Sequence, residues 1–524
     1  MFKRHRLAGA LLALTLLVGV SPVGTGNASS GDSSRYLVVF AGEYAVDGTY
    51  AVESTYAVLC NYAVQNGYAV AGGYAVGCSY AVGDDYAVSP VYAVAHDYAV
   101  SLVEAAGGSV VNDLLGQTGV FVVESSNGTF ADVMRSYAVV DEVGEDLVWQ
   151  GIPAGGRPGG GSPVAHADPA EALQWNMAMI RAPQAHAVNG GWSAVDVGIL
   201  DSGIDGTHVD FRDASGVSNV DCVRGRNFVP EGPGVGNPNP CIDNQVHGTH
   251  VAGIVAARAN GVGVVGVAPN VTLVPVKVCD APGYCYASAV VAGLTYAGDA
   301  ELDVINMSFF VDDDALLEST ELKCTSDPNQ RAFRESVGRA MRHAVKRGVT
   351  PVAAIGNSDT DLAQSAEPAG DDCDVVPAET PGVTATVALG PDSEKAGYSS
   401  YGSGAADVSA PGGNAIVTGA SCDDQILATI PGGYGCLQGT SMASPHAAGV
   451  AALVVSQIGK LSGNGDVKSS PSAVADRVMS SVVDIGLAGY DECFGQGRID
   501  ALRAVTNDRS GASAAAPFCT EYEE

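Results

Sequence analysis

The chain has 524 residues, 46% of them apolar and 16% charged, so it can bury a sizeable core and, at roughly 100 to 200 residues per domain, form two to four domains. Its 58 acidic residues outnumber the 26 basic ones, which leaves a formal net charge of −32. Such a surface repels phosphate backbones and anionic lipids, which argues against nucleic acid or a membrane as a partner. We expect a soluble protein and, by default, a monomer.

The N-terminus has the pattern of a secretory signal peptide. Three basic residues precede an apolar run at 7–20, and small residues follow up to Ala28. The run is short for a membrane span, and no later segment reaches the roughly 18 unbroken apolar residues that a spanning helix needs. We therefore expect residues 1–28 to be a signal peptide and the mature protein to be secreted and extracellular.

Twelve cysteines agree with export, because disulfides persist in oxidising compartments. Ten of them lie beyond residue 200, which is enough for five bridges. The simplest pairing joins near neighbours, such as Cys279 with Cys285 and Cys422 with Cys436, although the sequence leaves the connectivity open. The spacing lacks the CxxC pairs of a zinc site, so disulfides are favoured over metal.

Shifts in composition divide the chain. The expected parts are a signal peptide (1–28), an N-terminal module (29–150), a Gly/Pro-rich linker (151–167), a main domain (168–506) and an acidic tail (507–524). In the module, strand patterns occur at 35–40, 109–113, 120–125 and 141–149, and helical patterns at 98–108 and 129–140. This β-α-β-β-α-β order predicts a small α+β fold of the ferredoxin-like type.

A hexapeptide repeat, Tyr-Ala-Val every six residues, interrupts the module at 44–97. In a helix, successive tyrosines would lie roughly 240° apart and coat every side, which excludes one amphipathic face. A hexapeptide β-helix is disfavoured, because it needs a small residue where this repeat has tyrosine. We interpret the repeats as an expansion tolerated in a surface loop, with a role in export or folding as the alternative. Cys60 and Cys78 are candidates for a further disulfide.

The main domain alternates apolar strand patterns with helical segments. The strand patterns include 195–201, 271–278, 303–309 and 350–357. Such alternation predicts an α/β fold in which helices cover both faces of a parallel sheet. Ligands of such sheets bind beyond the carboxyl ends of the strands, so the reactive residues are expected there.

Three segments of the main domain each place a reactive side chain where a strand ends or a helix begins. They are "GILDSGIDGTHVDF" with Asp201, "HGTHVAGIVAA" with His247 and "GTSMASPHAAGVAAL" with Ser441. A serine hydroxyl becomes an effective nucleophile when a histidine accepts its proton and a carboxylate orients that imidazole. The three residues are therefore candidates for a catalytic triad.

These three segments, in the order Asp, His, Ser, resemble the signature blocks of the subtilisin-like serine peptidases. The similarity extends from about Asp168 to Val505 and includes "GVGVVGVAP", "INMS" and "GQGRID". The resemblance implies a subtilisin-like parallel sheet flanked by helices. It also implies that the protein is a serine endopeptidase that hydrolyses peptide bonds in protein or peptide substrates.

By the same resemblance, His247 is the general base, and Asn357 in "AAIGN" donates its amide to the oxyanion together with the backbone N–H of Ser441. We expect three other histidines to be structural: His208, His250 and His446. The implied substrate-binding residues are Ser308, Phe309, Phe310 and Gly356. The two phenylalanines stand where the family has a smaller residue and a glycine, so their rings are expected to narrow a pocket with apolar or aromatic preference.

The loop "ARANGVGVVG" (257–266) has the length and glycine pattern of the family's calcium site. The implied ligands are oxygens of five residues: Asp210, Arg258, Asn260, Val262 and Val264. Such a set suits a hard cation that takes about six to eight oxygens. A further ligand remains open between Glu171 and Gln174. The expected cofactor is a structural calcium ion.

The N-terminal module resembles the propeptide inhibitor of the same family, through "YLVVF", "VEAAGGSVVNDL" and "VDEVGEDL". Such modules assist folding and then occupy the cleft until they are cleaved. We expect a self-inhibited zymogen whose partner is its own propeptide, cleaved by the enzyme itself at or soon after Trp149, within 150–168. The alternative is a surface-binding protein that uses the Tyr-Ala-Val repeats and keeps the peptidase fold only as a carrier.

Overall fold

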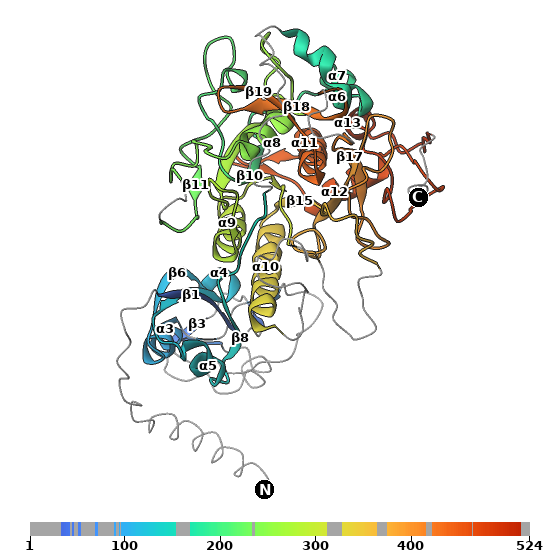
Figure 1. Ribbon diagram of the computed structural model, residues 1–524. Coiled ribbons are helices and arrows are strands. Elements are labelled where there is room, and N and C mark those ends of the chain that lie inside the picture. The colour runs from blue at the N-terminus through green and yellow to red at the C-terminus, as the bar shows by residue number, and fades with distance from the viewer. Residues whose placement is uncertain are drawn as a thin grey trace.

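The computed structural model describes a small N-terminal module, drawn in blue, and a larger domain, drawn from green to red (Figure 1). The described residues are 33–41, 44–46, 51–53, 69–71, 88–90, 94, 96–152, 168–232, 236–311, 327–363, 375–415, 422–463 and 465–514. The expected signal peptide, most of the repeats, most of the linker and the end of the acidic tail lie outside them. So do five cysteines: Cys60, Cys78, Cys324, Cys373 and Cys519.

The N-terminal module is a four-stranded antiparallel sheet with the strand order β6-β7-β1-β8. The strands are Gly108–Leu114, Val120–Ser125, Ser34–Phe40 and Val140–Glu145, and the helices are α3 (His96–Ala105), α4 (Leu115–Thr118) and α5 (Phe130–Arg135). This order confirms the ferredoxin-like prediction. Helix α5 is shorter than the expected 129–140, because Val140 already pairs with Phe40 of β1.

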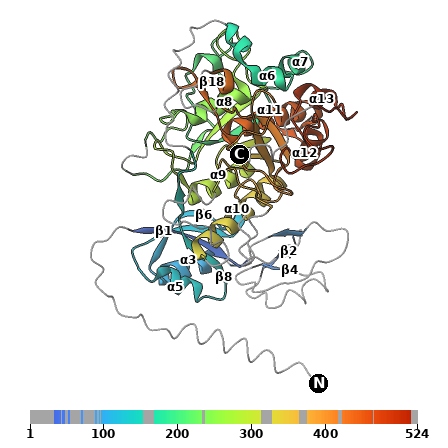
Figure 2. The same ribbon diagram turned by 45° about the vertical axis from the view of Figure 1, so that its right-hand side comes forward.

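Four short strands lie in the described parts of the repeat insertion. They are β2 (Tyr44–Val46), β3 (Ala51–Glu53), β4 (Ala69–Ala71) and β5 (Val88–Pro90). Strand β2 pairs with β5, and β3 pairs with β4. In Figure 2, β2 and β4 lie beside the module. The insertion therefore leaves the four-stranded sheet of the module intact.

A seven-stranded parallel sheet forms the centre of the larger domain, in the order β11-β12-β10-β14-β15-β16-β17. The strands are Arg226–Asn227, Thr272–Lys277, Asp196–Asp201, Val304–Met307, Thr350–Ala354, Thr384–Leu389 and Val408–Pro411. Helices α8 (His247–Ala256) and α11 (Thr440–Ile458) cover one face, and α9 (Ala287–Asp299) and α10 (Pro328–Lys346) the other (Figure 1). This arrangement buries the strands on both sides and confirms the expected α/β fold.

The remaining elements lie around this sheet. They are β9 (Val148–Trp149), β13 (Cys285–Tyr286), β18 (Ile426–Ile430), β19 (Gly433–Leu437), β20 (Lys460–Leu461), β21 (Val467–Lys468), α6 (Trp175–Met179), α7 (Ala182–His186), α12 (Pro471–Ser480), α13 (Ala501–Thr506) and the 3-10 turns Asp168–Leu173, Val209–Phe211 and Cys422–Asp424. None of the described helices is long and apolar enough to cross a membrane.

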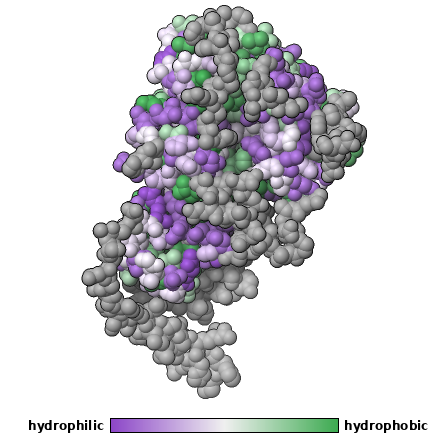
Figure 3. Space-filling model, viewed as in Figure 1, coloured by the Kyte–Doolittle hydropathy of each residue, from purple (hydrophilic) through white to green (hydrophobic). Residues whose placement is uncertain are grey.

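Helices α9 and α10 lie between the two sheets, so the module packs on the larger domain through them (Figure 1). Leu37 and Val122 of the module belong to the same apolar cluster as Phe333 of α10. Arg339 of α10 is buried, and it donates to a carboxylate oxygen of Asp141 at 2.9 Å. The two parts therefore share an apolar cluster at their contact, with charged contacts beside it. On the face drawn in Figure 3, hydrophilic residues predominate over both parts and hydrophobic ones are scattered.

Three disulfides join described cysteines, namely Cys222–Cys241, Cys279–Cys285 and Cys422–Cys436. The last two are the neighbour pairs expected from the sequence, and they are confirmed. The larger domain also extends past the expected boundary at 506. The N–H of Asp484 donates to the carbonyl oxygen of Ala512, and the carbonyl oxygen of Asp484 accepts the N–H of Ala514. The chain up to Ala514 therefore belongs to the domain.

Candidate active site

Asp201 and His247 meet at the carboxyl end of the central sheet. Asp201 is the last residue of β10, and His247 is the first residue of α8. The Nδ1 atom of His247 lies 2.9 Å from Oδ2 and 3.0 Å from Oδ1 of Asp201, and both side chains are buried. This geometry lets the carboxylate hold the imidazole with Nδ1 protonated, which leaves Nε2 able to accept a proton.

The start of α8 approaches the end of β10 closely through its backbone. The N–H of Gly248 donates to Oγ of Ser202 at 3.0 Å, and a Cβ on Gly248 would lie 2.1 Å from the carbonyl oxygen of Gly203. Val246 has φ 107°, which a β-branched residue rarely adopts. Its N–H donates to Oδ1 of Asp243 at 3.0 Å. Asp243 thereby holds a strained turn directly before the histidine.

Ser441 lies in the first turn of α11, which packs against α8. Its hydroxyl donates to the carbonyl oxygen of Ser308 at 3.1 Å, and the Ser308 hydroxyl donates to the Ser441 carbonyl at 2.7 Å. Within the described chain, Nε2 of His247 has no hydrogen-bond partner. A hydrogen bond between Ser441 and His247 is therefore not formed in this conformation. Such catalytic hydrogen bonds often form only when substrate binds.

Asn357 follows β15 and faces the start of α11. Its Oδ1 accepts the N–H and the hydroxyl of Thr440, each at 2.9 Å, which fixes the orientation of the amide. The oxygen is therefore directed at the helix, and Nδ2 lies 3.6 Å from the position that a Cβ on Gly439 would take. An amide N–H and the backbone N–H groups of a helix start are the donors that an oxyanion site needs.

The other histidines of the larger domain make structural contacts. Burial lowers the pKa of His250 to about 3 and that of His446 to about 4, so both are neutral at neutral pH. Nε2 of His250 lies 2.9 Å from the carbonyl oxygen of Ile426, and Nδ1 of His446 lies 2.8 Å from that of Met442. Nε2 of His208 contacts a backbone carbonyl in the same way.

The end of the N-terminal module lies as an added strand along the larger domain. Trp149 of β9 pairs with Cys285 of β13 in an antiparallel ribbon. Further along, the N–H of Ile152 donates to the carbonyl oxygen of Gly283 at 3.2 Å. Extended peptides bind an exposed strand edge in this way, with backbone hydrogen bonds and pockets for alternate side chains.

Of the expected substrate residues, Phe309 lies against this ribbon. Trp149 is fully buried, with its ring centroid 6.3 Å from that of Phe309 and 5.2 Å from that of Phe333. Phe310 is also buried, and Gly356 has φ 128° directly before Asn357. The Phe309 ring therefore forms a wall of the apolar site that receives a tryptophan of the module.

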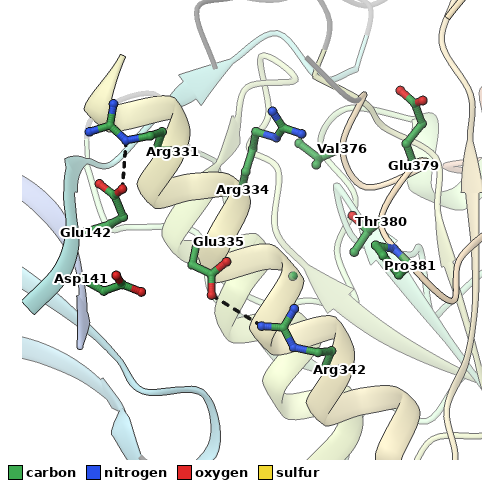
Figure 4. A pocket seen from close by; sticks show the side chains of 11 residues that line it. Asp141, Glu142, Arg331, Arg334, Glu335, Arg342, Val376, Glu379, Thr380 and Pro381 are labelled. Carbon is green, nitrogen blue, oxygen red and sulfur yellow. Dashed lines mark hydrogen bonds and ion pairs between the residues drawn. The ribbon is translucent and has the colours of Figure 1, made fainter. Parts of the chain in front are cut away.

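Polar contacts fix the module beside this ribbon. The carboxylate of Asp146 accepts the N–H of Ser288 at 2.7 Å and its hydroxyl at 2.6 Å, in the first turn of α9. Burial raises the pKa of Asp146, and the two bonds from Ser288 oppose that rise. A separate cavity of about 410 Å³ lies between β8, α10 and residues 376–381. Charged side chains line it, among them Arg331, which pairs with Glu142 (Figure 4).

The expected calcium loop closes around Asp210. This residue is buried, and its Oδ2 accepts the N–H of Val264 at 2.8 Å, while Oδ1 of Asn260 accepts the N–H of Val262 at 2.9 Å. A Cβ on Gly263 would lie 2.5 Å from Oδ2 of Asp210, so only glycine lets the loop approach so closely. The oxygens gathered here are of the hard type that calcium binds.

Of the two candidates for the further calcium ligand, Gln174 is better placed than Glu171. Oε1 of Gln174 accepts the N–H of Val265 at 3.0 Å, so this side chain adjoins the loop, whereas Glu171 is exposed. In the part of the chain that the structure describes, no three His, Cys, Asp or Glu side chains cluster as a metal site. Calcium would therefore rely on the one carboxylate of Asp210, with amide and carbonyl oxygens supplying the other ligands.

Sequence reasoning missed three residues that surround the expected triad. Thr440 orients Asn357, Asp243 holds the turn before His247, and Lys277 is buried beside Asp201. Two of them leave a signal in the sequence. Asp243 occurs in "DNQVHGTH", just before the histidine, and Lys277 interrupts the apolar strand "VTLVPVKV", where a charged residue is rarely buried.

Comparison with known proteins agrees with this geometry. A model of the subtilase family matches residues 193–497. Subtilisin NAT of Bacillus subtilis subsp. natto is 34% identical over 343 residues, which is 65% of this chain and 73% of that protein. Subtilisin of Bacillus pumilus is 34% identical over 337 residues, which is 64% of this chain and 100% of that protein.

Solved structures share the fold at lower identity. The epidermin leader peptide processing serine protease of Staphylococcus aureus matches with a TM-score of 0.62 and 19% identity, covering 91% of this chain and 98% of that one. A lanthipeptide protease matches with a TM-score of 0.53 and 24% identity, covering 64% of this chain and 93% of that one. At these identities the likeness supports the fold alone.

Proposed function

Since the chain belongs to the subtilase family and is a serine endopeptidase, we propose that Asp201, His247 and Ser441 carry out its catalysis and that it is made as a secreted, self-inhibited zymogen. The observation that carries the catalytic assignment is the buried contact of 2.9 Å between Nδ1 of His247 and Oδ2 of Asp201. The zymogen assignment is supported by Trp149, which is buried against Phe309 at the end of the module.

Catalysis begins when a peptide bond binds and the Ser441 hydroxyl turns from the Ser308 carbonyl to Nε2 of His247. The imidazole takes the proton as Oγ attacks the scissile carbonyl, while Asp201 holds Nδ1–H and stabilises the imidazolium. The amide of Asn357 and the backbone N–H of Ser441 stabilise the oxyanion. His247 then gives its proton to the leaving amine, and a water molecule hydrolyses the acyl-enzyme by the same steps.

The module inhibits because its last residues occupy the strand edge that a substrate needs. Pairing of β9 with β13 leaves no room there for a second extended chain. Cleavage within 150–168 separates the module from the catalytic domain, and its later loss frees the edge. A calcium ion held by Asp210 and Asn260 would neutralise the buried carboxylate and stabilise the loop, without a part in bond cleavage. The match to the subtilase family does not support the alternative of a surface-binding protein that uses the Tyr-Ala-Val repeats.

Labelling with a fluorophosphonate tests this proposal. The mature protein should be labelled, whereas Ser441→Ala should be unlabelled and should remain an uncleaved precursor when purified alone. Ser472→Ala, a matched change at an exposed serine of α12, should mature and be labelled like the parent. A Ser441→Ala protein that still matures at the same site in isolation would show that another group carries the reaction.

A further inference from the structure

A buried lysine lies beside the Asp201–His247 pair, and no step of the proposed mechanism uses it. Lys277 is the last residue of β12 and is in register with Asp201 on the neighbouring strand. Only 1% of Lys277 is exposed. Burying an ammonium group is costly unless it is hydrogen-bonded and paired with negative charge, so its contacts indicate what it does there.

The ammonium group of Lys277 donates to the carbonyl oxygen of Ser202 at 2.7 Å. Ser202 follows Asp201, and its N–H donates to Oδ1 of that aspartate at 2.7 Å. The Ser202 hydroxyl accepts the N–H of Gly248, the residue after His247, at 3.0 Å. Lys277 therefore fixes the residue that joins the strand carrying the carboxylate to the helix carrying the imidazole.

The same hydroxyl extends the network to a second carboxylate. Ser202 donates to Oδ1 of Asp243 at 2.9 Å, and the other oxygen of Asp243 accepts the N–H and the hydroxyl of Thr249 in α8. Asp243 also accepts the N–H of Val246, whose positive φ directly precedes His247. The histidine is thus held from both sides by groups that depend on Ser202 and Asp243.

Three buried carboxylates act on the lysine, namely Asp201, Asp243 and Asp280. Burial lowers the pKa of Lys277, and these three groups oppose the fall. His247 is faced by Asp201 and by His250, which burial keeps neutral. Buried anions need a counter-charge, which favours the cationic form of Lys277 at neutral pH.

We propose that Lys277 is a positioning residue for the catalytic pair: its ammonium group fixes the Ser202 carbonyl and supplies the positive charge that offsets the carboxylates around His247. This inference rests on the proposed roles of Asp201 and His247. Without the cation, the uncompensated negative charge favours the imidazolium form of His247. That form cannot accept the serine proton, so the enzyme should need a higher pH to become active.

The pH profile of kcat/KM tests the proposal on the mature enzyme, with a peptide p-nitroanilide as substrate. Lys277→Met keeps an unbranched side chain, one atom shorter, and removes the charge, and it should move the acidic midpoint upward by about one pH unit. Lys277→Arg keeps the charge and should leave the midpoint closer to that of the parent. Arg477→Met is the matched control, because this buried cation also donates to main-chain carbonyls, those of Ala504 and Val505. It should lower the melting temperature and leave the midpoint unchanged.

A second variant should shift the acidic midpoint of kcat/KM in the opposite direction. This test does not require that Lys277→Met folds. Oδ1 of Asp280 accepts the N–H groups of Gly283 and Tyr284, and Oδ2 accepts the hydroxyl of Tyr286. Asparagine can keep three hydrogen bonds in this place. Asp280→Asn removes one negative charge near the lysine and should move the acidic midpoint downward by about half a pH unit.

The outcomes separate this inference from the proposed function. Fluorophosphonate titration gives the fraction of active sites in each preparation, and labelling that persists in Ser441→Ala would refute the proposed function itself. A fully labelled Lys277→Met enzyme with an unmoved midpoint would overturn only the role of Lys277. If that variant does not fold, an Asp280→Asn midpoint that fails to move downward overturns it equally.

Discussion

Nδ1 of His247 lies 2.9 Å from Oδ2 of Asp201, and this contact decides which imidazole nitrogen is free to act as a base. In Asp201→Asn, the amide can donate to Nδ1, which places the imidazole proton on Nε2. We expect kcat to fall by about 10⁴-fold with little change in KM. Steady-state kinetics and circular dichroism check the activity and the fold.

The control for this change is a neighbouring carboxylate. Asp205 accepts the N–H and hydroxyl of Thr207 and does not contact the histidine among its described bonds. Asp205→Asn should keep kcat within about threefold of the parent, because an amide oxygen can still accept both bonds from Thr207. A loss of less than tenfold in Asp201→Asn would mean that the carboxylate does not set the tautomer.

The amide of Asn357 is predicted to stabilise the oxyanion. Asn357→Asp keeps the shape but replaces the donor with a negative charge, and kcat should fall by at least about 10²–10³-fold, the range for loss of one donor. Thr440→Val separates this effect from orientation, because it removes only one of the two bonds that Thr440 donates to the amide oxygen. It should cost less than about tenfold. Equal losses in the two variants would assign Asn357 to structure instead.

The positions of Asp201, His247 and Ser441 could be predicted because each lies within a long motif next to an element boundary. The apolar pattern at 195–201 also predicted β10 within one residue of its observed start at Asp196. Both signals are local, since they depend on residues close in the chain. The ferredoxin-like order of the module was predictable for the same reason.

Contacts between distant segments could not be predicted in this way. Trp149 fits between Phe309 and Phe333 only because the module docks on α10, and no pattern around the tryptophan indicates that partner. The rotamer of Ser441, which directs its hydroxyl to the Ser308 carbonyl, also depends on the packed structure. Composition suggested that the domain ends at 506, but backbone hydrogen bonds to Asp484 carry it further.

Burial of Trp149 is predicted to hold the module in place. In a Ser441→Ala chain, which cannot process itself under the proposed function, Trp149→Ala should lower the stability of the docked module by about 3 to 5 kcal/mol, the usual cost of removing a buried aromatic ring. Hydrogen exchange of the β13 segment should rise, because its partner strand β9 is released. Trp192→Ala, at a tryptophan that is 36% exposed, should leave that exchange unchanged. Unaltered protection of β13 in Trp149→Ala would contradict this role.

Removal of calcium tests the proposed ion at the loop 257–266. Chelation of calcium in a Ser441→Ala chain should lower its melting temperature. An ion present at about 100 times its dissociation constant adds about 2.7 kcal/mol to the free energy of unfolding. Asp210→Asn removes the one carboxylate of the expected site and should abolish the response to the chelator. Asp213→Asn changes a half-buried carboxylate on the neighbouring turn and should keep the response. A parent chain that ignores the chelator would rule out a stabilising ion at this loop.

The buried carboxylate of Asp303 should make the stability of the folded protein depend on pH. Asp303 is 4% exposed, and burial raises its pKa to about 7, with the charge of Asp196 adding to the rise. Its Oδ2 accepts the N–H of Asp196 at 2.9 Å, a bond that asparagine can also accept.

The sign follows from the raised pKa. An unfolded aspartate has a pKa of about 3.9, so the contribution of Asp303 to stability is complete below pH 4 and is lost as the pH rises through about 7. Asp303→Asn has no charge to bury, so its stability relative to the parent should increase between pH 4 and pH 8, by on the order of 2 to 4 kcal/mol. Denaturant unfolding of Ser441→Ala chains at the two pH values measures this difference. Glu492→Gln changes an exposed residue, and its stability relative to the parent should not change with pH. If the stability difference between Asp303→Asn and the parent is independent of pH, the carboxylate stays ionised in the folded protein.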